Sequence, residues 1–284
     1  MRWQGRRGSR NIEDRRRSGG VARTGGIGGI GLIAVLAIGY FLGVDVRPLL
    51  QGTGTGQVQT TGGGQITAAD EKAGQFVSVV LADTEAVWDE IFRQQLGRQY
   101  DQPTLVLFKG ATASPCGGAN GASGPFYCPG DRKAYLDTDF FATMERRMGA
   151  GGDFAAAYVV AHEVAHHVQN ELGILSKANQ IRAQVGQADS NRISVMIELQ
   201  ADCYSGIWAR HVEERFGALE RGDLKEALNA ARQIGDDTLQ RNAGRRPMPH
   251  TFTHGTSEQR QRWFATGYET GRLEACDTFG AERL

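Results

Sequence analysis

The stretch Ala157-Tyr-Val-Val-Ala-His162-Glu163-Val-Ala-His166-His167-Val-Gln-Asn170 decides how this chain is interpreted. It contains H-E-x-x-H, two histidines four residues apart with a glutamate beside the first. Four residues turn an α-helix by about 400°, so His162 and His166 project from one face. Two imidazoles placed in this way can bind one tetrahedral zinc ion, and Glu163 can reach a water on it. The alternative is a helix that carries histidines for packing, but the apolar run before His162 favours a buried active-site helix.

A second helical stretch, Ile197-Glu198-Leu-Gln-Ala-Asp202-Cys203, offers the remaining ligand. A catalytic zinc takes three protein ligands and keeps a fourth position for water. Glu198 and Asp202 share a helix face, which predicts Glu198 as a ligand and Asp202 as the acceptor for a ligand histidine N–H. Alone, E-x-x-x-D is more typical of a solvated face, but two acids in an apolar run favour a site. The metzincin class of zinc peptidases continues the first motif to a third histidine ligand. No such histidine follows His166, which excludes that class.

Taken together, these motifs resemble the gluzincin zinc peptidases and, more closely, the bacterial putative neutral zinc metallopeptidase family. Two further stretches carry the resemblance, Gly124-Pro-Phe-Tyr-Cys-Pro129 and Phe252-Thr-His-Gly-Thr-Ser257. It covers nearly all of residues 70–280 and the layout of the N-terminal region. The resemblance implies a zincin-like metallopeptidase domain, one Zn²⁺ per chain, and a peptide or protein substrate.

The expected chemistry is hydrolysis of a peptide bond by a zinc-activated water. Zinc lowers the pKa of a bound water, and Glu163 would act as the general base. The developing oxyanion needs a further donor, and His254 is the candidate because gluzincin-like enzymes often supply one from a C-terminal segment. Arg260 is either an anchor for that segment or a surface charge. Two alternatives stay open: a catalytically silent scaffold or binding module at the membrane, and a zinc hydrolase of a non-peptide bond.

Charge is distributed unevenly, although the formal net charge is zero. Residues 1–23 hold eight arginines against two acids, and residues 24–44 hold no charge. As a helix, the uncharged stretch spans about 31 Å, close to the hydrocarbon core of a bilayer, and predicts a transmembrane helix. A cleavable signal peptide is the alternative, but no small-x-small site follows. The positive-inside rule predicts a cytoplasmic tail (1–23) and a periplasmic catalytic domain.

The rest of the chain divides into a linker and one domain. Residues 45–67 are rich in Gly, Thr and Gln, which predicts a flexible linker. Residues 68–284 form the expected zinc metallopeptidase domain, of mostly helical α+β class, with no nucleic-acid footprint. The expected helices are 68–96, 139–148, 153–172, 189–216, 224–234, 236–241 and 257–275, with short strands at 104–108 and 133–137. A substrate would add along a sheet edge, near 133–137 or the loop that ends at Cys128.

All four cysteines lie in the expected exported domain: Cys116, Cys128, Cys203 and Cys276. An even count in such a domain points to two disulfides. Three pairings are possible. A bond between Cys116 and Cys128 would staple the glycine-rich loop and would leave Cys203 with Cys276.

Overall fold

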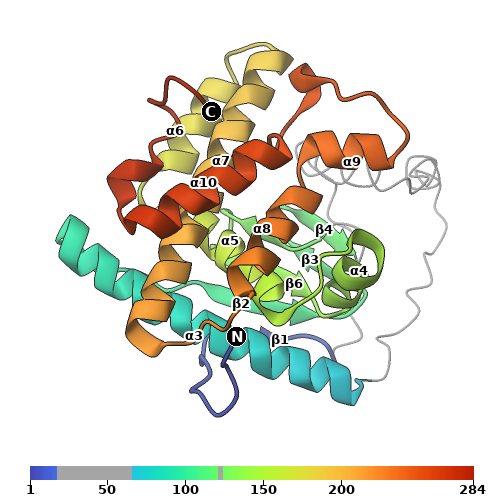
Figure 1. Ribbon diagram of the computed structural model, residues 1–284, viewed down its shortest axis with the longest axis vertical. Coiled ribbons are helices and arrows are strands. Elements are labelled where there is room, and N and C mark those ends of the chain that lie inside the picture. The colour runs from blue at the N-terminus through green and yellow to red at the C-terminus, as the bar shows by residue number, and fades with distance from the viewer. Residues whose placement is uncertain (18–65, 121–123) are drawn as a thin grey trace.

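The computed structural model describes residues 1–17, 66–120 and 124–284, which form a mostly helical α+β fold with two small sheets (Figure 1). The helices are α3 (Ala68–Leu96), α4 (Asp139–Met148), α5 (Asp153–Glu171), α6 (Ile174–Arg182), α7 (Gln187–Phe216), α8 (Asp223–Gln233), α9 (Asp236–Asn242) and α10 (Ser257–Thr270), with the 3-10 turns η1 (Pro249–Thr251) and η2 (Leu273–Cys276). The strands are β1 (Ile12–Asp14), β2 (Thr104–Phe108), β3 (Ala111–Ser114), β4 (Gly117–Asn120), β5 (Phe126–Cys128) and β6 (Lys133–Asp137). The predicted fold class is confirmed at this level.

The larger sheet has the strand order β1-β2-β6-β5, and β3 and β4 form a separate hairpin. Strands β1, β2 and β6 run parallel, whereas β5 is antiparallel to β6. One face of β2 and β6 turns into the main core through Leu105, Leu107, Ala134 and Leu136. The opposite face packs a smaller cluster that includes Val106, Phe108 and Tyr135. Because both faces are covered, β2 is apolar along its length instead of alternating.

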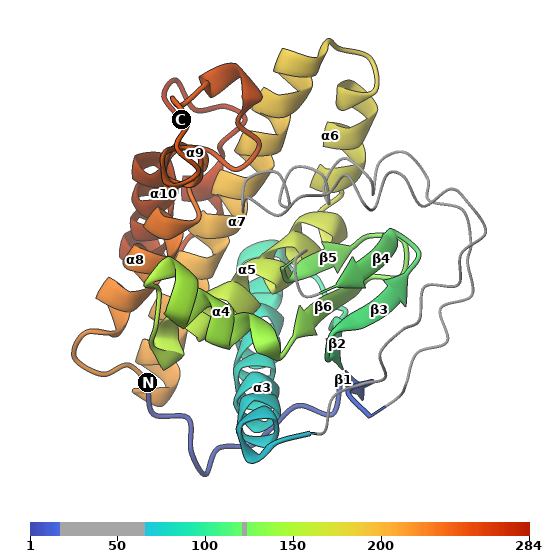
Figure 2. The ribbon, with the colours of Figure 1, turned by 90° about the vertical axis from the view of Figure 1, so that its right-hand side faces the viewer.

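Helix α5 lies between the sheet and the remaining helices (Figure 2). It contacts α3, α7 and α8 as well as β5 and β6. Its residues 154–165 are all buried. A helix enclosed on every side needs no solvated polar face, so the polar side chains that it does carry need a specific reason.

Helix α3 begins at a capping box, in which Thr67 and Asp70 each bond the backbone N–H of the other. Asp70 also accepts from Lys109 Nζ at 2.7 Å and from Thr138 Oγ1 at 3.1 Å. Burial disfavours the carboxylate, but the bonds from Lys109 and Thr67 outweigh burial and hold the pKa of Asp70 well below its ordinary value. The start of α3 is therefore tied to the ends of β2 and β6.

Helices α7 and α10 cross in close contact because two glycines lie at the crossing. A Cβ on Gly206 would lie 2.0 Å from the carbonyl oxygen of Phe264, and a Cβ on Gly267 would lie 1.8 Å from that of Cys203. Both obstacles are backbone atoms, which cannot turn aside as a flexible side chain does. The distance between the two helices is therefore set by the absence of side chains.

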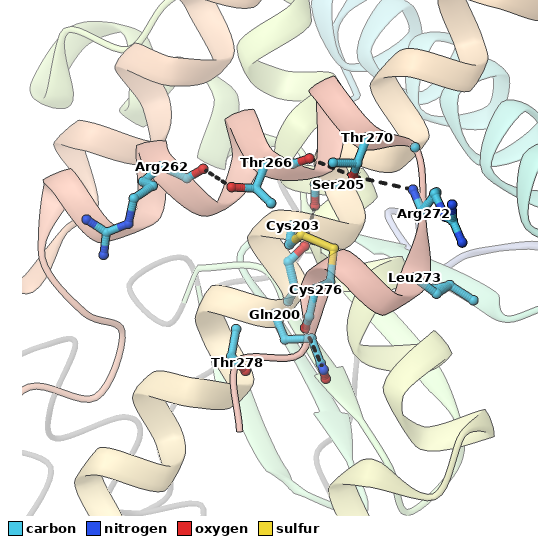
Figure 3. Close-up of a disulfide and its surroundings, with 12 residues drawn as sticks. Gln200, Cys203, Ser205, Arg262, Thr266, Thr270, Arg272, Leu273, Cys276 and Thr278 are labelled. Carbon is cyan, nitrogen blue, oxygen red and sulfur yellow. Dashed lines mark hydrogen bonds between the residues drawn. A yellow bond between two sulfur atoms is a disulfide. The ribbon is translucent and has the colours of Figure 1, made fainter. Parts of the chain in front are cut away.

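The cysteines pair as Cys116–Cys128 and Cys203–Cys276, one of the three pairings that the sequence leaves open. The first bond closes the glycine-rich loop onto β5. The second joins α7 to η2 (Figure 3). Its Cys203 also provides the carbonyl oxygen that faces Gly267 at the glycine crossing. Gln200 Nε2 donates to the carbonyl oxygen of Cys276 at 3.0 Å, so the C-terminal segment is fastened twice to α7.

Three features differ from what the sequence predicts. The last helix ends at Thr270 instead of 275, because Gly271 takes a left-handed conformation (φ 65°) that terminates it. Helix α6 follows α5 after a similar left-handed glycine, Gly173 (φ 75°). Strand β1 belongs to the segment predicted as a separate basic tail, yet it pairs with β2, so residues 1–17 pack on the body.

The predicted transmembrane helix, 24–44, lies outside the described residues and stays a prediction. So does the predicted linker, apart from its last two residues. Among the helices that the structure does describe, none combines the length and the apolar character needed to cross a bilayer.

We expect Gly206→Ala to lower the free energy of unfolding by about 3 kcal/mol, because the added methyl group overlaps the backbone of α10. Chemical denaturation of the full chain measures this loss. Gly186→Ser is the matched control, since a Cβ at that position, the start of α7, meets nothing within 4 Å. The control should change stability by less than about 1 kcal/mol. Equal stability of the two variants would contradict the close crossing.

Candidate metal centre

The two histidines of H-E-x-x-H lie side by side on α5. The rings of His162 and His166 form a T-shaped pair with centroids 4.8 Å apart. Their side chains are only 8% and 12% exposed. The helical spacing thus produces the shared face that the sequence predicts, and that face is buried against α7.

Glu198 on α7 brings its carboxylate to the same point. Its Oε2 lies 3.0 Å from His162 Nε2, and its Oε1 lies 3.6 Å from His166 Nε2. One ligand atom from each of these residues lies within 4.8 Å of the others. Ligands about 2.05 Å from a tetrahedral zinc ion are about 3.3 Å apart, so the two distances bracket the separation that zinc requires. The residues present therefore fit a zinc ion.

Contacts behind the rings determine which nitrogen of each histidine faces Glu198. His166 Nδ1 lies 2.9 Å from Gln169 Oε1, and Gln169 is fully buried and donates to the Ile197 carbonyl at 2.8 Å. His162 Nδ1 lies 3.0 Å from Asp202 Oδ1, at an angle outside that of a good hydrogen bond. Both rings present Nε2 to the centre. Sequence reasoning missed Gln169, although its position one turn after His166 was a usable signal.

Asp202 is the hub of a buried network behind the ligands. It receives Arg260 Nε at 2.8 Å and Arg260 Nη2 at 2.9 Å, and the Tyr158 hydroxyl donates to it as well. Asp202 is 0% exposed and Arg260 is 1% exposed. A bidentate pair with further donors is the geometry that offsets the cost of burying both charges. Of the two interpretations of Arg260, the buried anchor is therefore the one observed.

The centre carries an excess of negative charge. Three buried or half-buried carboxylates face one guanidinium, which leaves a formal charge of −2: Glu163, Glu198 and Asp202 against Arg260. Burial disfavours a charged imidazole, yet Asp202 and Glu198 raise the pKa of His162 to about 10. The surroundings thus stabilise a cation, and a divalent ion would balance the formal charge.

Glu163 stands next to the first histidine and is 8% exposed. Burial raises the pKa of its carboxyl to about 7; the charge of His162 works against this rise, and the charge of Glu198 adds to it. A bound divalent cation would draw this pKa down again. A carboxyl that ionises near neutrality is suited to accept a proton and to give it back.

Asp236, at the start of α9, holds the segment that carries His254. Its Oδ2 accepts hydrogen bonds from the backbone N–H groups of Thr253, His254 and Gly255 at 2.8, 2.6 and 2.9 Å. Its Oδ1 lies 3.4 Å from His254 Nδ1. Asp236 is 0% exposed. Sequence reasoning missed this residue, because it lies 18 residues before its histidine, where an acid in the first turn of a helix is ordinary.

This segment lies against the turn of α7 that bears Glu198. The Cα of Gly255 faces Val195 and Leu199, whose methyl groups would lie 3.3 and 3.1 Å from a Cβ there. The side chain of His254 is 32% exposed, more than those of the three candidate ligands. Burial lowers the pKa of His254, but Glu198 and Asp236 outweigh it and raise that pKa. His254 is thus near enough to Glu198 to respond to its charge, and more exposed than the candidate ligands.

His167 and His250 lie outside the centre. His167 is 1% exposed and lies between the Tyr127 hydroxyl, 3.0 Å from Nδ1, and the Asp101 carbonyl, 2.6 Å from Nε2. His250 is exposed. His167 therefore fastens β5 and the loop before β2 to α5 and takes no part in the centre.

A second group of acids, Asp153, Asp223 and Glu226, also has its oxygens close together. The ammonium group of Met1 lies 2.5 Å from Asp153 Oδ1 and 3.4 Å from Asp223 Oδ1. This group therefore already has a cation of the chain itself, and it contains no histidine.

Comparison with known proteins agrees with the geometry. The family model described as "Putative neutral zinc metallopeptidase" matches residues 1–279. The chain is similar to "Uncharacterized protein YpfJ" of Escherichia coli (strain K12), at 47% identity over 289 residues, covering 99% of both chains. It is also similar to "Uncharacterized protein Rv2575" of Mycobacterium tuberculosis, at 43% identity over 228 residues, covering 77% of this chain and 75% of that one. No solved structure matches.

We expect Arg260→Met to lower the free energy of unfolding by about 3–5 kcal/mol, because it leaves the Asp202 carboxylate buried without its ion partner. Denaturant unfolding of the full chain measures the effect. Arg93→Met is the control, since Arg93 is 60% exposed in its pair with Asp89 and should matter by no more than about 1 kcal/mol. Similar losses of unfolding free energy in both variants would contradict the role of the Arg260–Asp202 pair in stabilising the helix packing.

Proposed function

The chain belongs to the putative neutral zinc metallopeptidase family, and from this membership we propose that it is a zinc-dependent peptidase that hydrolyses peptide bonds. One observation carries the proposal: His162, His166 and Glu198 converge at zinc-ligand spacing with Glu163 beside them. A small sheet ahead of the H-E-x-x-H helix supports a zincin-like arrangement of the domain. We propose one zinc ion per chain.

Each residue of the centre has a distinct part in the proposed reaction. When bound, zinc makes water a nucleophile near neutral pH and polarises the scissile carbonyl. His162, His166 and Glu198 would hold the ion. Glu163 takes a proton from the attacking water and passes it to the leaving amine, which its position and its pKa near neutrality permit. Asp202 keeps the ring of His162 in place, and Arg260 keeps Asp202 charged.

His254 is the proposed donor to the oxyanion that develops on the substrate carbonyl. It lies at the more exposed side of the centre, where a substrate would enter. Asp236 acts through it as a positioning residue: it fixes the backbone of residues 253–255 and contacts His254 Nδ1. The ring then has its Nε2 free to donate.

The proposed substrate is an extended peptide that adds to a sheet edge. Strand β6, one of the two places that the sequence suggests, has β2 on one side and β5 on the other, so it offers no free edge. Strand β5, within the loop closed by Cys116 and Cys128, is the outer strand of that sheet and contacts α5. We therefore place the substrate beside β5.

The decisive test compares Glu163→Gln with His162→Ala in the purified full-length chain. Because Glu163 moves protons but holds no metal, the glutamine variant should keep about one zinc ion per chain and lose at least about 100-fold in turnover. The alanine variant should lose the zinc as well. Elemental analysis gives the metal content, and a library of peptides of mixed sequence reports cleavage. Full turnover by Glu163→Gln would overturn the mechanism.

The same experiment separates the alternatives. A wild-type chain that binds zinc and cleaves no peptide, yet retains one partner protein, would support the scaffold. Cleavage of ester or amide substrates other than peptides would support a hydrolase of a non-peptide bond.

His254→Ala should lower kcat about 100-fold and leave zinc content and KM nearly unchanged, because the lost hydrogen bond forms in the transition state. Asp236→Asn should lower kcat by about tenfold, since it loosens His254 without removing it. His250→Ala, an exposed histidine on the neighbouring η1, is the control and should behave as wild type. A change in KM alone for the His254 variant would remove this residue from the chemistry.

A further inference from the structure

Helix α3 presents two buried carboxylates that find their partners in the N-terminal tail, defined here as residues 1–17. Asp83 and Glu85 are 3% and 4% exposed. Arg6 Nη2 lies 2.6 Å from Asp83 Oδ1, and Asn11 Nδ2 lies 2.9 Å from Glu85 Oε1. The Ser9 hydroxyl donates to the same Glu85 oxygen. Buried acids would be costly without these donors, so α3 is suited to receive the tail.

Backbone and apolar contacts extend the same interface. Strand β1 runs parallel to β2, and Arg15 N donates to the Leu107 carbonyl at 2.7 Å, so the tail completes one edge of the sheet. The Trp3 ring meets the Phe76 ring edge to face, with centroids 5.4 Å apart. Met1 is 5% exposed and belongs to the main core. These are the contacts of a folded domain and not of a loosely attached segment.

Three arginines of the tail pair with carboxylates of the body: Arg6 with Asp83, and Arg16 and Arg17 with Glu71. Arg16 is 6% exposed, its Nη2 lies 3.5 Å from Glu71 Oε2, and Gly74 leaves the space that its guanidinium occupies. Arg17 Nη2 lies 2.8 Å from Glu71 Oε1. The basic run that the sequence interprets as a cytoplasmic signal thus has a second explanation, since its charges neutralise acids of the same domain.

The last residues of the tail contact the first turn of α3. Arg16 Nη1 lies 2.5 Å from the Asp70 carbonyl, and Arg17 pairs with Glu71, both in the first turn of α3. Thr67 caps that turn. The end of the tail and the start of α3 therefore lie beside each other.

We propose that residues 1–17 are an integral part of the domain formed by residues 66–284, and that both occupy the same compartment. A helix at 24–44 that crossed a membrane once would place them on opposite sides and break every contact described above. The family match also begins at residue 1, which puts the tail inside the shared unit. The proposal does not depend on peptidase activity.

A cysteine cross-link tests the docking directly. An ideal Cβ on Gly8 lies 3.4 Å from Ser78 Cβ, close to the Cβ separation of about 3.8 Å in disulfides. We expect Gly8→Cys/Ser78→Cys to cross-link in the full-length chain under mild oxidant. A specific protease site inserted between Gln51 and Gln65 then yields two fragments that separate only after reduction.

Gly8→Cys/Gln99→Cys is the matched control, because it keeps the tail cysteine and moves its partner to an exposed residue past the end of α3, more than about 27 Å along the helix from Ser78. It should give about tenfold less cross-linked product. No cross-link in the first variant, or equal yields in both, overturns the docking.

Compartment is tested with single exposed cysteines, which should not disturb folding. Arg10→Cys reports on the tail and Gln99→Cys on the body, while the native cysteines are held in disulfides. Intact cells are treated with a membrane-impermeant maleimide, and lysed cells give the maximum labelling. Labelling of both positions, or protection of both until lysis, supports a shared compartment. Labelling of only one of the two cysteines in intact cells would overturn the shared compartment.

Discussion

The buried carboxylate of Asp202 is the constraint on which the arrangement of the central helices depends. A fully buried charge is tolerated only where partners surround it, and here they come from different helices: Tyr158 and His162 on α5, and Arg260 on α10. Helices α5, α7 and α10 must therefore meet at one point with little freedom. The glycine crossing, one turn along α7 from Asp202, and the bond from Cys203 to the C-terminal segment restrict the same helices further. The spacing of the candidate ligands is a product of that packing.

Sequence reasoning succeeded where the relevant interactions are local. The shared faces of the two histidines and of Glu198 with Asp202 follow from helical periodicity, and most helix boundaries follow from apolar spacing and glycine stops. It had no access to partners that are distant in sequence. Arg260 lies 58 residues from Asp202, and its burial decides its role. Asp236 reaches His254 through backbone N–H groups, which leave no residue pattern to detect.

The N-terminal segment shows why a run of charge is ambiguous without its partners. Arginines before an uncharged stretch are typical of a membrane signal, and the same arginines are typical of a segment that neutralises acids in a fold. The choice between the two depends on Asp83 and Glu71, which lie more than 50 residues away from the arginines that they pair with. Strand β1 was also invisible in sequence, because three residues in an arginine-rich context carry no period-2 pattern.

The docked tail and the proposed catalytic site are linked through the sheet. A four-stranded sheet has two edges, and an uncovered edge is a template for any extended peptide. With β1 docked on β2, the two edges of this sheet are β1 and β5, and β5 packs on α5. The tail thus replaces the five-residue edge of β2 with the three-residue edge of β1, and a very short edge strand is a poorer template for an incoming peptide. This favours the β5 side, where Tyr127 and His167 fasten the sheet to the helix that carries the candidate ligands.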